Sequence, residues 1–253
     1  MTTSMATRTV RLVALGDSVT AGIGDAGLGN QRLGWSAHVA HALGARDFVN
    51  LAEPGARARD VLGRQLPEAL RLNPTVATLL VGGNDVLRRD FDSWAVGTQV
   101  AACVQALTQV GCDVLVSLLH DPEFICPLPA YVRHVLSLRA RGVNEAIKEC
   151  VGTIPGAVLI DPTVMPESRQ RAAWHVDRMH PGPLGHRALA RVGVRALSEL
   201  GWIPRAKLPQ EPMTRPATWK SVGWLIAVGL PWLAKRSFRS EEHTSELQSR
   251  VDI

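Results

Sequence analysis

Residues 10–20 of the chain read VRLVALGDSVT. The first six residues form a short, nearly continuous apolar run, which is typical of a strand buried on both faces of a parallel sheet. Gly16, Asp17 and Ser18 follow without a break, so we expect the serine just beyond the carboxyl end of this strand, where parallel sheets bind ligands. A serine there is also a common helix N-cap, so by itself it does not indicate an enzyme.

Similar apolar runs recur along the chain, separated by stretches with the apolar spacing of helices. Strand alternating with helix predicts right-handed crossovers and a three-layer α/β/α sandwich around a five-stranded parallel sheet. The second helical stretch contains Pro67, which we expect to break it. The further predicted strands are residues 48–51, 76–81, 114–119 and 157–160, and the predicted helices are residues 34–43, 58–72, 93–110, 131–151 and 185–200.

Composition excludes several classes of protein. Hydrophobic residues make up 46% of the 253 residues and charged residues 20%, which is ordinary for a globular domain and excludes a collagen, a coiled coil and a fully disordered chain. The net charge of +5 comes from basic residues scattered along the chain. Because no block of Lys and Arg is present to follow a phosphate backbone, we expect no nucleic-acid partner.

The cysteines and the amino-terminal residues bear on the cellular compartment. Cys103, Cys112, Cys126 and Cys150 form no C-x-x-C pair, and none has a histidine at metal-ligand spacing. We therefore expect reduced, mostly buried thiols and no metal site. Residues 1–10 contain no apolar run of signal-peptide length, so we expect a cytoplasmic protein.

The composition changes after the last predicted helix. We expect one domain over residues 1–203 and a linker over residues 204–218, which contain four prolines. Residues 239–253 (RSEEHTSELQSRVDI) are similar to a translated sequencing-adapter oligonucleotide. We expect them to be a non-native tail and exclude them from the prediction of the fold.

A tryptophan-rich segment, residues 219–238, begins at Trp219 and ends at Phe238. Its apolar core is too short to span a bilayer comfortably, whereas its tryptophans and the Lys235-Arg236 pair suit a helix lying in the membrane interface. A helix docked on its own domain or on a partner would have the same pattern. Peripheral membrane contact through this segment therefore remains one of two expectations.

Two further glycine-containing segments follow predicted strands. Residues 81–85 read VGGND, and the Asn84 side chain offers two N–H donors that can stabilise an oxyanion. The alternative is that Asn84 and Asp85 cap the next helix. Gly55 follows the second predicted strand, where its N–H can point into the same cleft, although Pro54-Gly55 is also an ordinary turn.

The last segment with catalytic potential is residues 177–181, DRMHP. An aspartate three residues before a histidine can accept the Nδ1–H of the imidazole, which leaves Nε2 free to act as a base towards a serine. Asp177 and His180 have this spacing. His175 and His186 have no aspartate at this spacing, so we expect neither to be the base.

The segments around residues 16–18, 55, 82–85 and 177–180 resemble the motifs of the SGNH or GDSL hydrolase family and follow the same order along the chain. The resemblance extends over residues 10 to about 200. Residues 177–190 and the tryptophan-rich segment look most like the intracellular actinobacterial branch. The family resemblance implies a flavodoxin-like fold. The matching residues are Gly16, Asp17, Ser18, Gly55, Gly82, Gly83, Asn84, Asp85, Asp177 and His180.

The resemblance also implies roles, which agree with those expected from the residues themselves. Ser18 would be the nucleophile, His180 the general base and Asp177 the acid that orients it. The oxyanion hole would consist of the backbone N–H groups of Ser18 and Gly55 and the side chain of Asn84. No metal or organic cofactor is implied.

Asp17, Gly83 and Asp85 would support these groups. The chain departs from the family at residues 181–183, which read PGP where a Leu-Ser-Pro-like turn is frequent. This departure affects the backbone beside His180 and removes no reacting group.

The sequence therefore predicts a serine hydrolase that cleaves a small-molecule carboxylic ester through an acyl-enzyme. The alternatives are a non-catalytic module of the same fold that binds an acyl ligand or a partner, and a structural protein at a membrane surface. Short-chain acyl esters, lysophospholipids and acetylated sugars all remain open as substrates, as does the oligomeric state. We expect residues 25–33 and 91–94 to wall the cleft, and Arg88 and Arg89 either to attract an acidic substrate or to be solvated.

Overall fold

The computed structural model describes residues 8–26, 32–124 and 128–208. Their five strands are all parallel and form one sheet in the order β2-β1-β3-β4-β5. This is the doubly wound, flavodoxin-like order, so the predicted fold is confirmed. The strands are β1 (Arg11–Gly16), β2 (Asp47–Asn50), β3 (Val76–Leu80), β4 (Asp113–Ser117) and β5 (Ala157–Ile160).

Burial follows the position of each strand in the sheet. β1, β3 and β4 lie at the centre and are almost entirely buried, as their continuous apolar runs predict. β2 lies at the edge and all four of its residues are exposed, which explains why its apolar signal is the weakest. Leu12 of β1 pairs with Val76 of β3, and Ala77 of β3 pairs with Val114 of β4.

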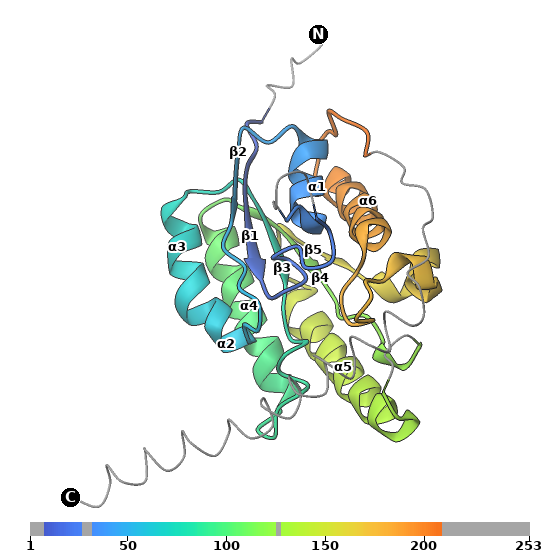
Figure 1. Cartoon of the computed structure of the whole chain (residues 1–253). Helices are drawn as coiled ribbons and strands as arrows, with labels where there is room; N and C mark the ends of the chain where they lie inside the picture. Colours follow the sequence, from blue (N-terminus) through green and yellow to red (C-terminus); the bar gives the residue numbers. More distant parts are fainter. Residues whose placement is uncertain (1–7, 27–31, 125–127, 209–253) are drawn as a thin grey trace, which may run out of the picture.

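Helices cover both faces of the sheet (Figure 1). α1 (Gly34–Leu43) and α6 (Pro183–Glu199) pack together on one face. The other face carries α2 (Ala58–Asp60), α3 (Leu66–Arg71), α4 (Ser93–Gln109) and α5 (Ala130–Val151). Short 3₁₀ turns follow β4 and β5, and they lie next to the carboxyl edge of the sheet.

The helical stretch between β2 and β3 corrects one expectation, because Pro67 does not break it. A π-helical turn, Val61–Gln65, joins α2 to α3, and the Leu66 N–H donates to the carbonyl of Val61, five residues back. Pro67 then occupies the first turn of α3, directly after the π turn, where its fixed φ suits a helix. The wider π turn therefore allows the proline to remain within a continuous helix.

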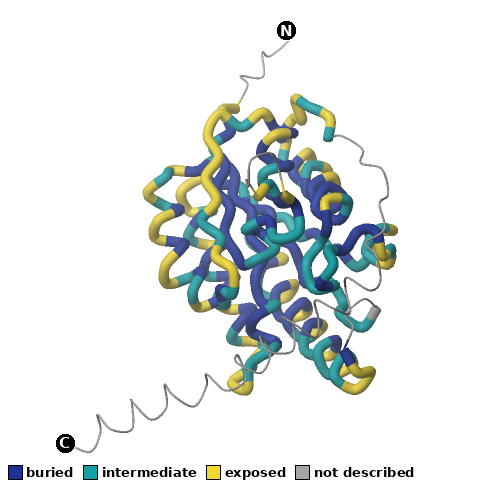
Figure 2. The backbone as a smooth tube through the Cα atoms, viewed as in Figure 1, coloured by how far each residue is buried: buried dark blue, intermediate teal, exposed yellow. Residues whose placement is uncertain are grey.

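The core extends from the sheet into the helical layers on both of its faces, and Figure 2 shows the buried backbone concentrated in the centre of the molecule. Trp35 of α1 is completely buried. Its Nε1–H donates to Thr20 Oγ1 over 3.2 Å, so this core side chain also holds the segment that follows Ser18. Packing of the core is thus connected directly to the position of the serine.

The cysteines are structural where they are described. Cys103 and Cys112 are buried, Cys150 is half-buried, and all three thiols are free. Burial raises the pKa of Cys103 and of Cys112 to about 12, so neither thiol ionises near neutral pH. Cys126 lies outside the described residues.

The described chain continues past the expected domain boundary at residue 203. The N–H groups of Arg205 and Ala206 both donate to the carbonyl of Ala42, at the end of α1. The remainder of the expected linker, the tryptophan-rich segment and the tail that we expect to be non-native lie outside the described residues. Among the helices that are described, none is long and apolar enough to cross a membrane.

Candidate active site

The predicted site residues meet at the carboxyl edge of the sheet. In the sheet, β1 lies between β2 and β3. The chain leaves β1 towards β2 on one side and leaves β3 towards β4 on the other, so these two connections diverge at the carboxyl edge and leave a crevice. The loops after β1, β2 and β3 supply Ser18, Gly55 and Asn84, and the segment before α6 supplies His180. All four residues line one cavity of about 400 Å³.

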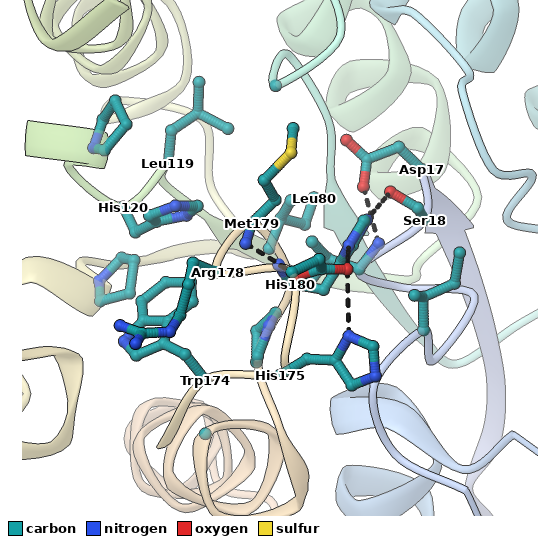
Figure 3. A pocket seen from close by; sticks show the side chains of 18 of the residues that line it. Asp17, Ser18, Leu80, Leu119, His120, Trp174, His175, Arg178, Met179 and His180 are labelled. Atoms are coloured by element: carbon teal, nitrogen blue, oxygen red, sulfur yellow. Dashed lines mark hydrogen bonds and ion pairs between the residues drawn. The ribbon is translucent and has the colours of Figure 1, made fainter. Parts of the chain in front are cut away.

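Ser18, His180 and Asp177 form a continuous chain of hydrogen bonds (Figure 3). The Ser18 hydroxyl lies 2.7 Å from His180 Nε2, and His180 Nδ1 lies 2.8 Å from Asp177 Oδ2. A carboxylate only accepts hydrogen bonds, so it holds the proton on Nδ1 and leaves the Nε2 lone pair directed at the serine hydroxyl. The fold thus brings together two residues that are 162 positions apart.

Asp177 is buried and surrounded by donors. Its Oδ1 accepts the backbone N–H groups of Met179, over 2.9 Å, and of His180, over 3.0 Å. Burial opposes ionisation, but contacts with His175 and His180 outweigh it and hold the pKa of Asp177 well below its ordinary value. The carboxylate is therefore ionised throughout the neutral range.

The structure adds a contact of His175 that its sequence spacing did not indicate. Its Nδ1 lies 3.0 Å from Asp177 Oδ2, so it contacts the same carboxylate as His180 although its sequence spacing is different. The contact arises because the backbone doubles back: the His175 N–H donates to the carbonyl of His180 over 2.9 Å. This same hydrogen bond supports the His180 backbone beside residues 181–183, where the chain departs from the family.

His186 is a structural histidine, as expected. Its Nδ1 accepts the backbone N–H of Trp35 over 3.1 Å, and its Nε2 donates to the carbonyl of Ile23 over 2.9 Å. It thus joins α6 to α1 and to the loop that carries Ser18. Burial lowers the pKa of His186 to about 4, so the ring is neutral at physiological pH.

Gly16 explains how the chain turns into the Ser18 loop. Its φ is +141°, and a Cβ at this position would lie 2.2 Å from the carbonyl oxygen of Leu80, so only glycine fits. The buried Gln65 side chain binds both backbone groups of Gly16, accepting its N–H over 2.8 Å and donating to its carbonyl over 2.9 Å. The π turn between α2 and α3 supplies this glutamine, which no sequence motif indicated.

The loops that carry Gly55 and Asn84 are joined to each other. Asn84 Nδ2 donates to the carbonyl of Ala56 over 3.0 Å, which leaves its second N–H for a ligand. Gly55 has a φ of +88°, in the left-handed region that favours glycine. The turn and the hydrogen bond together place both residues on the same wall of the cavity.

Asp85 joins the same two loops more firmly. It accepts the Arg57 Nε–H over 3.0 Å and the Ala58 backbone N–H over 3.1 Å. Burial raises the pKa of Asp85 in spite of these donors. Asp85 therefore caps α2, although the two are 27 residues apart in the chain. The alternative that Asn84 and Asp85 cap the helix that follows them is wrong, because that helix is α4 and Asp92 caps it.

Arg57 and Asp17 complete the support. Arg57 also binds Asp90 over 3.0 Å. Nothing in the sequence indicated this role, because Arg57 is not part of a recognisable motif. Asp17 is buried, and its Oδ1 accepts the N–H of Val19 over 3.0 Å. A Cβ on Gly83 would lie 3.6 Å from Asp17 Oδ2, so the two loops approach closely beside the serine.

The walls of the cavity differ from expectation. No described residue of 25–33 or 91–94 lines it, and neither Arg88 nor Arg89 does. Asp25 is instead buried against His38, with 2.7 Å between Oδ2 and Nε2. The far wall is mostly apolar and comes from the segments that follow β4 and β5, which include Leu118, Leu119, His120, Leu128, Leu136, Met165 and Trp174.

His120 and Trp174 form part of that wall, with ring centroids 4.5 Å apart. Burial, with a smaller contribution from His180, lowers the pKa of His120 to about 4, so this ring is neutral near pH 7. Within residues 8–26, 32–124 and 128–208, no group of three His, Cys, Asp or Glu side chains could hold a metal ion.

Comparisons with known proteins identify the family and the fold. The model of the GDSL-like Lipase/Acylhydrolase family matches residues 14–188. No curated protein matches the chain. Three similar solved structures are the lipase Lip_vut3 from a goat rumen metagenome, the acetylxylan esterase Axe2 from Geobacillus stearothermophilus and the α/β hydrolase enzyme LAE5 from a Lake Arreo metagenome.

The likeness to these structures extends over most of each chain. Lip_vut3 has a TM-score of 0.59 at 20% identity, covering 77% of this chain and 99% of its own. Axe2 has a TM-score of 0.57 at 20% identity, covering 79% of this chain and 99% of its own. LAE5 has a TM-score of 0.58 at 21% identity, covering 76% of this chain and 97% of its own. At such identities the likeness shows the fold.

Proposed function

The chain belongs to the GDSL-like lipase/acylhydrolase family of carboxylic ester hydrolases, and we propose that it cleaves its substrate through an acyl-enzyme formed on Ser18. The observation that carries this mechanism is the 2.7 Å contact between Ser18 Oγ and His180 Nε2, in line with Asp177. A serine hydroxyl becomes a competent nucleophile when a positioned base takes its proton. The order of the three groups provides that base and keeps it in the required tautomer.

In the proposed reaction, Ser18 Oγ attacks the ester carbonyl carbon while His180 Nε2 takes the hydroxyl proton. The tetrahedral intermediate then expels the alcohol, which receives that proton from His180, and the acyl group remains on Ser18. Water gives a proton to His180 and attacks the acyl-enzyme. The carboxylic acid leaves, and the proton returns to Ser18.

We propose that the oxyanion is held by the backbone N–H groups of Ser18 and Gly55 and by the side chain of Asn84. These groups line the same cavity as the nucleophile, and hydrogen bonds within the protein fix their loops before substrate arrives. Donors fixed in advance need no reorganisation during the reaction, and one such donor contributes roughly 3 kcal/mol in comparable sites. Asp17, Gly83 and Asp85 act by positioning these loops.

We further infer membership of the intracellular actinobacterial branch, supported by residues 177–190 (DRMHPGPLGHRALA). That placement implies a cytoplasmic enzyme acting on a small-molecule ester. Fractionation of the source cells tests it, because the protein should be recovered from the cytoplasm or from the cytoplasmic face of the membrane.

The test of the mechanism is labelling by a fluorophosphonate probe together with turnover of p-nitrophenyl butyrate. The wild-type protein should react with both, and Ser18→Ala should do neither while keeping its melting temperature. Ser168→Ala is the matched control, since Ser168 lines the same cavity but its hydroxyl donates to the carbonyl of Met165. Undiminished turnover by Ser18→Ala would remove Ser18 from the mechanism, and a wild-type protein that binds esters without labelling would be the non-catalytic module.

A further inference from the structure

Arg178 has an unusual backbone conformation for its residue type. It lies in the loop between Asp177 and His180 and has a φ of +58°, in the left-handed region. The turn there allows Asp177 Oδ1 to accept the N–H groups of Met179 and His180. A glycine would make this turn without strain, and strained backbone of this kind occurs frequently at active sites.

The Arg178 guanidinium has no counter-charge among the described residues. Its Nε is buried and makes no hydrogen bond. Arg133 and Arg187 also have a buried Nε without a hydrogen bond, but in both the Nη1 group donates to a backbone carbonyl, that of Leu128 and that of Pro183.

The carboxylates that line the cavity with Arg178 are all engaged elsewhere. Asp177 contacts the histidines, Glu167 pairs with Arg191, and Asp17 accepts the N–H of Val19. Burial lowers the pKa of Arg178, and the neighbouring cation of Arg171 lowers it further. Two positive charges that repel each other create a local demand for an anion.

Arg178 is also placed to contact a substrate. It lines the same cavity as Ser18 and His180. Figure 3 shows it on the side of His180 where His120 and Trp174 lie, opposite Ser18. A molecule whose ester carbonyl is at Ser18 would therefore extend along apolar walls before it reached the guanidinium.

We propose that Arg178 binds a carboxylate or phosphate group of the substrate, so that the enzyme acts on amphiphilic, anionic esters. This inference rests on the proposed function, since it places the ester bond at Ser18. The planar guanidinium suits both oxyanions, because it donates two parallel N–H groups to either. The apolar lining of the cavity accepts the hydrocarbon part.

Two pairs of substrates distinguish an anionic group on the acyl half of the ester from one on the alcohol half. In the first pair the charge is on the acyl half: the p-nitrophenyl half-ester of suberic acid is compared with p-nitrophenyl octanoate. In the second pair the charge is on the alcohol half: 1-octanoyl-glycerol-3-phosphate is compared with 1-octanoyl-glycerol. For each pair the measured quantity is the ratio of kcat/KM, anionic over neutral.

The variant is Arg178→Asn, because asparagine tolerates the left-handed conformation and keeps the turn. Arg195→Gln is the matched control for net charge, since Arg195 is exposed on α6 and does not line the cavity. Loss of a charged hydrogen-bond partner predicts that the ratio for at least one pair falls about tenfold or more in Arg178→Asn. In Arg195→Gln each ratio should stay within about twofold of its wild-type value.

A second readout does not depend on turnover. Octyl phosphate or suberate should raise the melting temperature of Ser18→Ala, and this shift should vanish in the Ser18→Ala, Arg178→Asn double variant. If neither ratio changes in Arg178→Asn and neither anion stabilises Ser18→Ala, the anion site does not exist, even though neutral esters are hydrolysed. If instead no ester is hydrolysed by the wild-type protein, the proposed function fails, and the melting shifts alone decide the anion site.

Discussion

At the scale of single residues, the histidines of this chain show how surroundings assign different tasks to one side chain. His180 has a carboxylate on one nitrogen and a hydroxyl on the other, so it can relay a proton. His186 has a backbone donor and a backbone acceptor, so it serves as a brace. His120 packs against the Trp174 ring and is kept neutral by burial, so it can line an apolar wall.

The buried His186 predicts a dependence of stability on pH. Its pKa is about 4 in the folded protein and 6.5 when unfolded, so between these values only the unfolded state takes up the proton. The free energy of unfolding should therefore fall as the pH drops from 6.5 to 4. This ring alone should account for about 3 kcal/mol, because 2.5 pKa units separate the two states.

The measurement is urea unfolding of the wild type and of His186→Gln at pH 7 and at pH 4. Glutamine can accept from Trp35 and donate to Ile23 but does not titrate in this range, so the variant should lose about 3 kcal/mol less than the wild type on acidification. His41→Gln is the control, because His41 is exposed. Parallel losses in the wild type and His186→Gln would show that His186 is not buried as a neutral ring.

At the scale of elements, the π turn Val61–Gln65 connects helix geometry to the site. It accommodates Pro67 and at the same time directs Gln65 towards Gly16, at the end of β1. π turns inside helices occur frequently at functional sites. Here the turn fixes the backbone two residues before the nucleophile.

Gln65→Leu should destabilise the protein and slow catalysis. The change keeps a side chain of similar size but leaves the buried N–H of Gly16 without a partner, which costs roughly 2 kcal/mol. Urea unfolding should show this loss, and kcat for p-nitrophenyl butyrate should fall because the Ser18 loop is less well held. Gln109→Leu, at an exposed position of α4, should change neither quantity. Unchanged stability of Gln65→Leu would show that the pair of hydrogen bonds is dispensable.

At the scale of the whole molecule, a single sheet carries the complete candidate site, and the described chain ends with residues 204–208 beside α1. We propose that residues 1–203 are the hydrolase domain, that residues 204–218 are a linker and that residues 219–238 contact a membrane surface peripherally. Trp202 closes the domain: its Nε1–H donates to Asp113 over 2.9 Å, and the Arg8 guanidinium lies 4.0 Å from its ring centroid.

Chains ending at residue 208 and at residue 238 test this organisation. Both should hydrolyse p-nitrophenyl butyrate equally and melt within a few degrees of each other, because the core and the candidate site as the structure describes them are built from residues up to 208. Only the longer chain should sediment with anionic liposomes, through its tryptophans and its Lys235-Arg236 pair. If the shorter chain melts well below the longer one and neither binds liposomes, the segment docks on its own domain instead.

The sequence by itself determined the layers and the strands of this protein, and it singled out the groups that we propose to react. Continuous apolar runs report burial on both faces of a sheet, and the order of the short motifs along the chain identifies the serine, histidine and aspartate as candidates. Only the tertiary structure decided which residues support the site: Gln65, Arg57 and His175 act through contacts between segments distant along the chain or through a turn of the backbone. It also moved the cavity wall to the segments after β4 and β5 and left Arg178 without a counter-charge, because walls and ion pairs depend on which loops meet in space.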